Sequence, residues 1–237
     1  MKKNLTAAFT LIELLVVITI IAILASVALP AFIGVQERAN QTKDLSNAKQ
    51  IALAMKQFAT DNNGAFPSRQ PAADYTTSTD LTGANHANDA FWWLFPTYLT
   101  SEDIFVVAGS KWTPSNPDNI LDPAGSAART NTLKAGEDNY AYITQLTDTS
   151  NPAFPLLMDG FSTTIPKYDT SKSNVGGVWA ARKAIVAFCD ASGQIMKVDP
   201  ASLTVLRPGH AYSLFSNSNS TATDPWLTAA NLVLNPE

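Results

Sequence analysis

The chain has 237 residues, of which 46% are hydrophobic and 15% are charged, so a disordered or collagen-like chain is excluded. The formal net charge of -4 leaves no strongly basic field, and nucleic acid is not expected as a main partner. Cys189 is the one cysteine, which excludes an intramolecular disulfide and, with it, a disulfide-stapled secreted domain.

The first informative element is an apolar segment near the N-terminus. No charged residue occurs from Leu14 to Gln36, and a helix of that length crosses the roughly 30 Å of bilayer hydrocarbon at about 1.5 Å per residue. Lys2 and Lys3 precede the segment, and the first acidic residue is Glu13. Lysines on this side favour a cytoplasmic N-terminus, so we expect the rest of the chain to lie outside the membrane.

Three details distinguish this segment from an ordinary membrane anchor. Glu13 lies at the edge of the apolar run, where an ionised carboxylate without a counter-charge costs on the order of 2.5–3.5 kcal/mol on insertion scales. Small residues, Ala7 and Ala8, stand immediately before Phe9, whereas the cleavage site of a secretory signal follows its apolar region. Pro30 lies deep in the run, where proline removes a backbone hydrogen bond and is expected to kink or locally melt the helix.

The stretch AAFTLIELLVVITIIAILASVALPAF resembles the class III signal of type IV prepilins and type II secretion pseudopilins. The resemblance implies that a membrane prepilin peptidase cuts between Ala8 and Phe9 and methylates the new amine of Phe9. Glu13 and Pro30 then match the family's glutamate and its frequent helix-breaking proline. The family usually has glycine before the cut, and this chain has Ala8, which is small enough to fit but is expected to slow processing.

The resemblance also supplies a hypothesis about assembly. Cleavage would give Phe9 a positive amine, and Glu13 would carry a negative charge at membrane depth. A buried ion pair is weak evidence for stability but suits the setting of register. We therefore expect Glu13 of an incoming subunit to pair with the Phe9 amine of a neighbour, which would set the axial step of a filament and draw the subunit out of the bilayer.

An amphipathic helix is expected to continue the apolar segment. Hydrophobic residues recur at three- and four-residue steps, at Leu45, Ala48, Ile51, Ala52, Met55, Phe58 and Ala59. Polar residues are interpreted as the other face, at Lys43, Asp44, Lys49, Gln50, Lys56 and Asp61. Asn62-Asn63-Gly64 predicts the C-terminal cap, and Pro67 prevents continuation. The expected organisation is a leader at 1–8, a transmembrane and filament-core helix at 9–35, its amphipathic continuation at 36–63 and a loop-rich extracytoplasmic domain at 64–237.

The outer domain predicts a small antiparallel sheet among loops. We expect a polar loop at 68–89 and then an aromatic segment, 91–99, that packs on the long helix or, alternatively, forms a carbohydrate-contact patch. Short strand patterns occur at 139–143, 155–158, 184–189 and 194–198, the last two joined by a hairpin loop at 190–193. Cys189 is interpreted as a small buried apolar residue, and Leu232 to Leu234 are expected to pack back on the sheet. The predicted fold class is α+β, a long N-terminal helix packed against a small antiparallel sheet, as in pilins.

No cluster of residues indicates an enzyme or a resident cofactor. His86 and His210 stand outside any zinc-binding or catalytic pattern, and no nucleophile-elbow, Walker-type or dinucleotide motif is present. The carboxylates near Asp122, Glu137, Asp138 and Asp159 are candidates for calcium, because some pseudopilins bind calcium in an outer loop, although no EF-hand pattern occurs. The sequence therefore predicts no catalytic residue and no metal site of a recognised motif.

The resemblance implies a structural subunit of a type IV pilus-like filament or a type II secretion pseudopilus. Its expected partners are homologous pilin subunits, the prepilin peptidase, an inner-membrane assembly platform and membrane lipid. The expected location is the bacterial inner membrane, with a cytoplasmic N-terminus and a C-terminal domain in the periplasm or, after assembly, outside the cell. The alternative is a membrane-anchored extracytoplasmic ligand-binding domain that does not form filaments. The sequence does not distinguish a secretion pseudopilus from an adhesive or DNA-uptake pilus, or a major from a minor subunit.

Overall fold

The computed structural model describes residues 9–67, 86–124, 126 and 129–237. The chain divides into two compact units, Met1–Asn40 and Gln41–Glu237, and each is described by itself. One helix of 51 residues, α1 (Leu11–Asp61), contributes to both units.

The first unit contains the apolar part of α1. By length and composition it holds a stretch able to cross a membrane, and none of that stretch is buried within the chain. Its large hydrophobic side chains range from 46% exposed at Val17 to 81% at Leu11. The helix is continuous through position 30, and the kink expected at Pro30 stays a prediction.

The second unit buries one face of α1, as its periodicity predicts. Ala48, Ile51, Ala52, Met55, Phe58 and Ala59 are all buried, and Leu45 is half-buried at the edge of the same face. The assignment of Asp44 to the polar face is wrong, because this residue is only 2% exposed. Asp44 precedes Ala48 by four residues and Ile51 by seven, so the same helical geometry that buries those two also buries the carboxyl group.

The C-terminal end of α1 is capped by the residues that the sequence indicated. Asn63 takes the left-handed conformation with φ of 54°, and the Gly64 N–H donates to the Ala59 carbonyl at 2.8 Å. This bond, from the second residue beyond the cap to the third residue inside the helix, is the Schellman arrangement. The left-handed position is therefore taken by asparagine, and the glycine follows it.

The sheet has five antiparallel strands in the order β4-β3-β2-β1-β5. Their bounds are β1 (Tyr140–Ile143), β2 (Pro155–Asp159), β3 (Lys183–Phe188), β4 (Gly193–Lys197) and β5 (Val233–Leu234). The first four match the predicted strand segments within two residues, and β3 and β4 form the expected hairpin. The tail returns as β5, whose Leu234 pairs with Tyr142 of β1.

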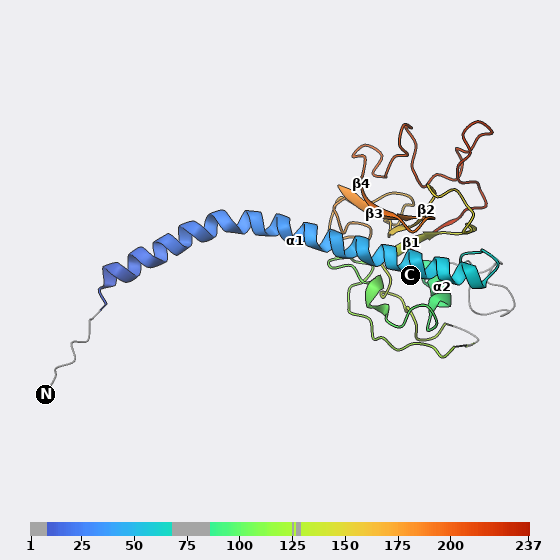
Figure 1. The fold of residues 1–237 in the computed structure, drawn as a ribbon. Coiled ribbons are helices and arrows are strands. Elements are labelled where there is room, and N and C mark those ends of the chain that lie inside the picture. The colour runs from blue at the N-terminus through green and yellow to red at the C-terminus, as the bar shows by residue number, and fades with distance from the viewer. Residues whose placement is uncertain (1–8, 68–85, 125, 127–128) are drawn as a thin grey trace. The chain divides into compact units, whose positions relative to one another are not determined.

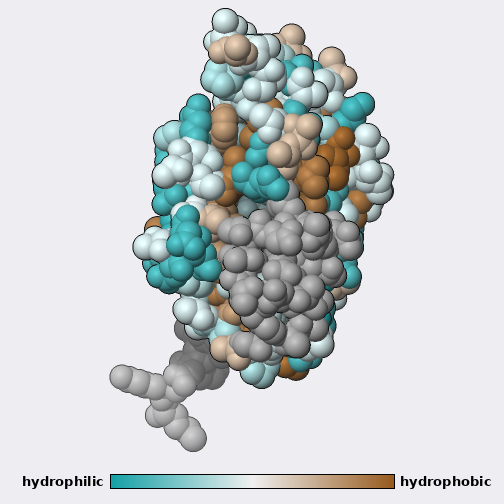
Figure 2. Space-filling model, turned by 90° about the vertical axis from the view of Figure 1, so that its right-hand side faces the viewer, coloured by the Kyte–Doolittle hydropathy of each residue, from teal (hydrophilic) through white to brown (hydrophobic). Residues whose placement is uncertain are grey.

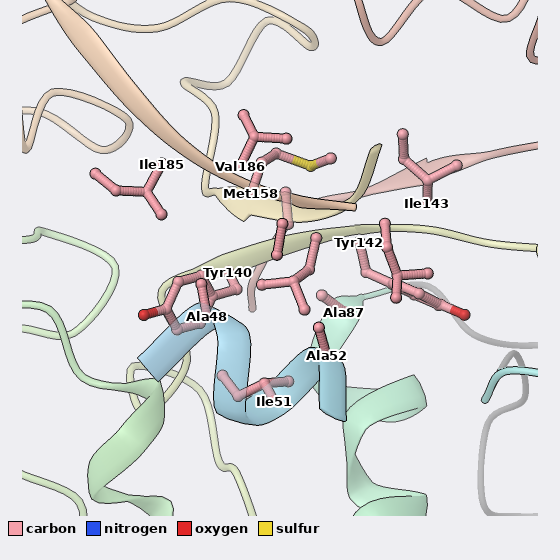
Figure 3. Close-up of a cluster of buried hydrophobic side chains, with 14 of the residues drawn as sticks. Ala48, Ile51, Ala52, Ala87, Tyr140, Tyr142, Ile143, Met158, Ile185 and Val186 are labelled. Atoms are coloured by element: carbon pink, nitrogen blue, oxygen red, sulfur yellow. The ribbon is translucent and has the colours of Figure 1, made fainter. Parts of the chain in front are cut away.

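The core of the second unit lies between α1 and the sheet. The strands follow one side of the C-terminal half of α1, and the segment with α2 (Ala87–Phe91) lies on another side (Figure 1). Ala48 and Ala52 of α1 lie on the side of the helix that faces Tyr140 and Met158 of the sheet, and Ile51 lies farther from the sheet in the same buried cluster (Figure 3). Gly193 lets β4 come close to the helix, because a Cβ there would lie 2.9 Å from Leu45 Cδ1. The α+β architecture is thus the predicted one.

The aromatic segment after α2 packs on the long helix. Phe91, Trp92, Leu94 and Phe95 are buried, and α2 is followed by a short 3-10 helix, η1 (Trp92–Leu94). The Tyr98 ring meets Phe58 of α1 at 5.7 Å between centroids, and its hydroxyl donates to Asp61 Oδ2 at 2.7 Å. Most of the segment therefore belongs to the core. A carbohydrate-contact patch requires exposed aromatic rings, and Phe91, Trp92 and Phe95 are buried. The predicted polar loop at 68–89 is wrong at its end, where Ala87 to Asp89 are helical, and its first part, 68–85, lies outside the described residues.

Cys189 follows β3 and is 1% exposed, as expected of a small apolar residue. Burial raises the pKa of its thiol to about 12. The thiolate, which is the nucleophilic form, is therefore absent at neutral pH.

Candidate assembly site and buried carboxylates

Thr10 and Glu13 form a capping box at the start of α1. The Thr10 backbone N–H and hydroxyl donate to Glu13 Oε2 at 2.8 and 2.7 Å, and the Glu13 N–H donates to Thr10 Oγ1 at 3.3 Å. Because α1 begins at Leu11, Thr10 is the N-cap and Glu13 is the third helical residue. The pattern Thr-x-x-Glu before an apolar run is a sequence signal for a capping box. The resemblance to prepilins assigned Glu13 to assembly only and did not predict this capping role.

The predicted processing residues lie next to this capping box. Phe9 is 75% exposed immediately before Thr10, and Ala8 lies outside the described residues. Both hydrogen bonds from Thr10 go to Oε2 of Glu13, and Oε1 accepts none from the described residues. The helix start therefore holds the carboxylate in place through one oxygen and leaves the other open.

A buried polar contact joins α1 to the sheet in the second unit. The Tyr140 hydroxyl of β1 donates to Asp44 Oδ1 at 2.7 Å. Asp159, at the end of β2, accepts from the Trp179 indole N–H at 2.9 Å and from the Ile185 backbone N–H at 2.8 Å, both to Oδ2. Asp44 and Asp159 are 2% and 0% exposed. The helix and the sheet are thus connected by polar groups inside an otherwise apolar layer.

Burial governs the electrostatics of this contact. It raises the pKa of Asp44 well above the ordinary value, and the neighbouring negative charge of Asp159 raises it further. Burial also raises the pKa of Asp159, partly offset by the hydrogen bonds that its carboxylate accepts. Two neighbouring carboxyl groups in a low-dielectric layer favour a state in which the pair retains one proton. Asp44 accepts fewer hydrogen bonds than Asp159, so the proton is expected on Asp44.

The carboxylates proposed for calcium lie in separate surroundings. Asp122 is buried, and although burial alone raises its pKa, hydrogen bonds from Thr130, Asn131 and Thr132 lower it overall. Asp138 accepts from the Tyr140 N–H, and Asp159 belongs to the contact with Asp44. The structure does not bring these four residues together, and calcium at them stays a prediction.

Glu137 instead meets two carboxylates that the sequence did not single out. One carboxylate oxygen from each of Glu102, Asp118 and Glu137 lies within 4.8 Å of the others, and we call these three residues the acidic cluster. Glu102 is fully buried, and burial together with the charges of Glu137 and Asp118 raises its pKa to about 7. No sequence motif joins the three, because Glu102 and Asp118 are 16 residues apart and Asp118 and Glu137 are 19 residues apart.

The histidines have structural surroundings. His86 is the N-cap of α2, where its backbone N–H donates to Asp89 Oδ2 at 3.2 Å. His210 stacks on Tyr212 at 4.8 Å between centroids and lies 3.5 Å from an oxygen of Asp224. Neither histidine belongs to a group of potential metal ligands within the described residues.

A surface depression of about 500 Å³ lies beside β4, lined in part by Met196, Arg207 and Trp226. Arg207 stacks on the Trp226 ring at 3.9 Å and donates to Asp224 at 2.7 Å. Its charge is therefore already paired, and the other described residues that line the depression are not basic.

Comparisons with known proteins found one family model and several relatives that match part of the chain. The family described as "Prokaryotic N-terminal methylation motif" matches residues 3–29, which include Phe9 and Glu13. A fimbrial protein of Neisseria meningitidis is 42% identical over 84 residues, 34% of this chain and 47% of that protein. Type II secretion system core protein G of Aeromonas hydrophila is 36% identical over 74 residues, 31% of this chain and 51% of that protein. The type IV major pilin protein PilA of Myxococcus xanthus is 44% identical over 55 residues, 23% of this chain and 25% of that protein.

The chain is thus similar, over part of its length, to type IV pilins and to a type II secretion pseudopilin. The chain spans about half the length of the first two relatives, and each match covers about a third of this chain. No solved structure matches the chain significantly.

Proposed function

We propose that this chain is a structural subunit of a type IV pilus-like filament or type II secretion pseudopilus. A prepilin peptidase would cut between Ala8 and Phe9 and methylate the Phe9 amine, and the apolar half of α1 would hold the subunit in the inner membrane until assembly. The observation that carries the proposal is the methylation motif at 3–29, placed at the start of a helix whose apolar side chains have no cover within the chain. In a filament, the equivalent helices of other subunits would cover the apolar side chains that lipid covers in the membrane.

The capping box refines the proposed part played by Glu13. Thr10 holds Oε2, which orients the carboxylate at the helix start, and Oε1 is left to accept the Phe9 amine of a neighbouring subunit. An ion pair with one such partner fixes register, because a shift along the filament would leave a charge unpaired in a low-dielectric surrounding. The outer unit, Gln41–Glu237, would then form the surface of the filament.

Glu13→Gln tests this proposal and separates charge from capping. Glutamine at the third helical position still accepts from the N-cap N–H, so the helix start is kept and the charge is lost. We expect mass spectrometry of the mature wild-type and variant chains to show N-methylated Phe9 in both, with normal membrane insertion. Filament yield in the native host should fall about tenfold or more, the order expected when a buried charge loses its partner.

Two outcomes would contradict the proposal. A mature chain that retains residues 1–8 would remove the amine, and normal filaments from Glu13→Gln would show that no ion pair is needed. A chain that is processed but never forms filaments, even as wild type with its assembly machinery present, would favour the anchored ligand-binding domain.

A further inference from the structure

The sheet of the second unit has two edges, and the described residues cover them differently. At one edge, β5 has two residues, and beyond it the Asn235 carbonyl accepts from the Ala87 N–H, at the start of α2, at 2.8 Å. The Asn235 side chain is bonded as well, since it accepts from the Phe161 N–H and donates to the Ser162 carbonyl, both at 3.0 Å. At the other edge, β4 has a neighbouring strand on one side only. Native proteins usually cover or interrupt such an edge, so β4 calls for an explanation.

The register of the β3–β4 hairpin shows which backbone groups of β4 point away from the sheet. The Phe188 N–H donates to the Ser192 carbonyl at 2.9 Å, so every second residue counted from Ser192 bonds to β3. The residues between them, Gly193, Ile195 and Lys197, direct their N–H and C=O groups outward. Among the described residues, no hydrogen bond reaches these outward groups. The edge is therefore ready to pair with another extended chain.

The side chains along this edge combine apolar surface with positive charge. Ile195 is 38% exposed, and on the opposite face of β4 Met196 lines the depression of about 500 Å³. Lys197 is exposed and lies directly opposite Lys183 of β3, whose Nζ donates to Gln41 Oε1 at 3.2 Å. Neither lysine has an ion-pair partner within the described residues. Like charges directly opposite each other destabilise a sheet, so an acidic group bound between the two lysines would relieve their repulsion.

The chain's own carboxylates near β4 do not supply that acidic group. Hydrogen bonds from Ser202 and, to a smaller extent, the charge of Lys197 lower the pKa of Asp199. Its Oδ2 accepts from the Ser202 N–H at 2.8 Å and from the Ser202 hydroxyl at 2.6 Å, which holds the carboxylate in its own turn. Asp190 lines the depression at the hairpin end of β4. An acidic side chain from a partner is therefore favoured at the Lys197 end and disfavoured at the Asp190 end.

Pairing between the β4 strands of two copies is opposed by the same charges. In an antiparallel pairing centred on Ile195, Lys197 of one copy would lie opposite Gly193 of the other. The Lys49 side chain of α1 lies over Gly193, since a Cβ there would be 3.1 Å from Lys49 Cε. Lys197 would thus approach a like charge at both ends of the pairing. Charged side chains on an edge commonly prevent pairing of identical strands, and here they leave an acidic strand as the favoured partner.

We propose that the open edge of β4 binds an extended, acidic segment of a partner protein, which adds a sixth strand to the sheet. One acidic side chain of the segment lies against Lys183 and Lys197, and an apolar side chain on the other face enters the depression beside Met196. Successive side chains of a strand point to opposite faces, so the two residues are neighbours in the segment or an odd number of positions apart. Main-chain hydrogen bonds give affinity in this mode, and the side chains give specificity. The proposal does not depend on cleavage at Ala8 or on filament formation.

Hydrogen exchange of the full chain in detergent micelles, resolved by residue with NMR, tests this mode of binding. The probe is a short blocked peptide in which glutamate alternates with valine. The Ile195 and Lys197 amides should exchange rapidly in the free chain and slow about tenfold or more with saturating peptide. The Gln194 and Met196 amides, which bond to β3, should be slow with and without peptide. A peptide with lysine in place of glutamate should leave all four amides unchanged at the same concentration.

Two variants separate the charge of the edge from its backbone. Lys197→Glu leaves the backbone groups in place and should weaken binding of the glutamate peptide about tenfold or more. Lys111→Glu is the matched control, because it makes the same charge change beside Ser162 and Asp169, and it should bind like wild type. Ile195→Pro removes an outward N–H and no bond to β3, a change that edge strands tolerate, so the variant should keep its unfolding temperature and lose the peptide. If Ile195→Pro does not fold, Lys197→Glu and its control still decide the question.

Three results would overturn the proposal. The first is unchanged exchange of the Ile195 and Lys197 amides at millimolar concentration of the glutamate peptide. The second is equal binding of the glutamate and lysine peptides, which would show that the lysines select nothing. The third is self-association of the chain that Ile195→Pro abolishes, because a second copy and not an acidic partner would then occupy the edge.

Discussion

The two halves of α1 share one backbone but have opposite surroundings. In the first half, Val17 is 46% exposed and Leu24 65%, and apolar residues occupy every side of the helix. In the second half, Ile51 is fully buried while Leu53 remains 53% exposed, so a single face is covered by the chain's own sheet. A helix that is apolar all round requires lipid or other helices, whereas an amphipathic helix is satisfied within its own domain.

The outer unit shows the complementary surface. On the face in Figure 2, hydrophilic and intermediate residues make up most of the coloured surface, and hydrophobic residues appear between them. Scattered exposed apolar residues are normal for a soluble domain. On this face the outer unit therefore differs from the first half of α1, whose exposed side chains are almost all apolar.

The largest test of this comparison is Ile51→Ala against Leu53→Ala. Ile51 is fully buried in the core of the second unit, so its truncation should destabilise this unit by about 2–5 kcal/mol. Leu53→Ala, two residues away on the exposed face, should change the free energy of unfolding by less than about 0.5 kcal/mol.

Urea unfolding of the full chain in micelles, followed by tryptophan emission, measures both variants. All five tryptophans lie beyond Gln41, so the signal reports the second unit alone. Ile21→Ala, in the exposed apolar half, should leave this transition unchanged. Equal losses of unfolding free energy in Ile51→Ala and Leu53→Ala would contradict the burial of Ile51 and the exposure of Leu53.

A smaller effect is expected where the second half of α1 buries a carboxyl group. The folded-state pKa of Asp44 lies above its unfolded value, so the folded chain retains a proton that the unfolded chain releases. The contribution of Asp44 to stability is therefore greatest at low pH and falls as pH rises from about 4 toward the folded-state pKa, at about 1.4 kcal/mol for each unit of difference. The facing titratable groups are Asp159, Tyr140 and Tyr168, and none is a cation at neutral pH.

Asp44→Asn should remove much of the loss of stability that the wild type shows as pH rises. The amide oxygen still accepts from the Tyr140 hydroxyl, and the amide NH₂ replaces the proton next to Asp159. We expect the variant to equal the wild type near pH 4 and to be more stable by about 1 kcal/mol or more at pH 8. Asp190→Asn, whose carboxylate is exposed, controls for loss of negative charge. An unchanged slope of stability against pH would show that the pair does not hold the extra proton.

Local patterns predicted much of this fold. The three- and four-residue periodicity placed Ala48 to Ala59 on the buried face, and Asn62-Asn63-Gly64 marked the helix end because few residues tolerate positive φ. Strand composition and the turn at 190–193 located β3 and β4. Each of these signals acts over a few neighbouring residues, which is why one sequence was enough.

Contacts between distant segments were not predictable in this way. The charge of Asp44 favours a place on the surface, although its helical position is on the buried face. Its hydrogen-bond partner Tyr140 is 96 residues away in the sequence, so no local pattern indicates their contact. Glu102, Asp118 and Glu137 share no motif, since loops bring them together. The methylation motif, by contrast, is contiguous, so the resemblance to prepilins could be drawn from neighbouring residues, and that resemblance implied the roles of Phe9 and Glu13.

The smallest expected effect concerns the start of the exposed half of α1. Thr10→Ala removes the hydroxyl that accepts from the Glu13 N–H and donates to its carboxylate, so the first turn should lose about 1 kcal/mol. Hydrogen exchange at the Glu13 amide of the full chain in micelles should quicken about fivefold, the equivalent of that free energy. Thr19→Ala is the matched control, because the Thr19 hydroxyl bonds the Leu15 carbonyl inside the helix and caps nothing. If both variants leave Glu13 exchange unchanged, the capping box does not hold the carboxylate, and Glu13 would meet a neighbouring amine without a preset orientation.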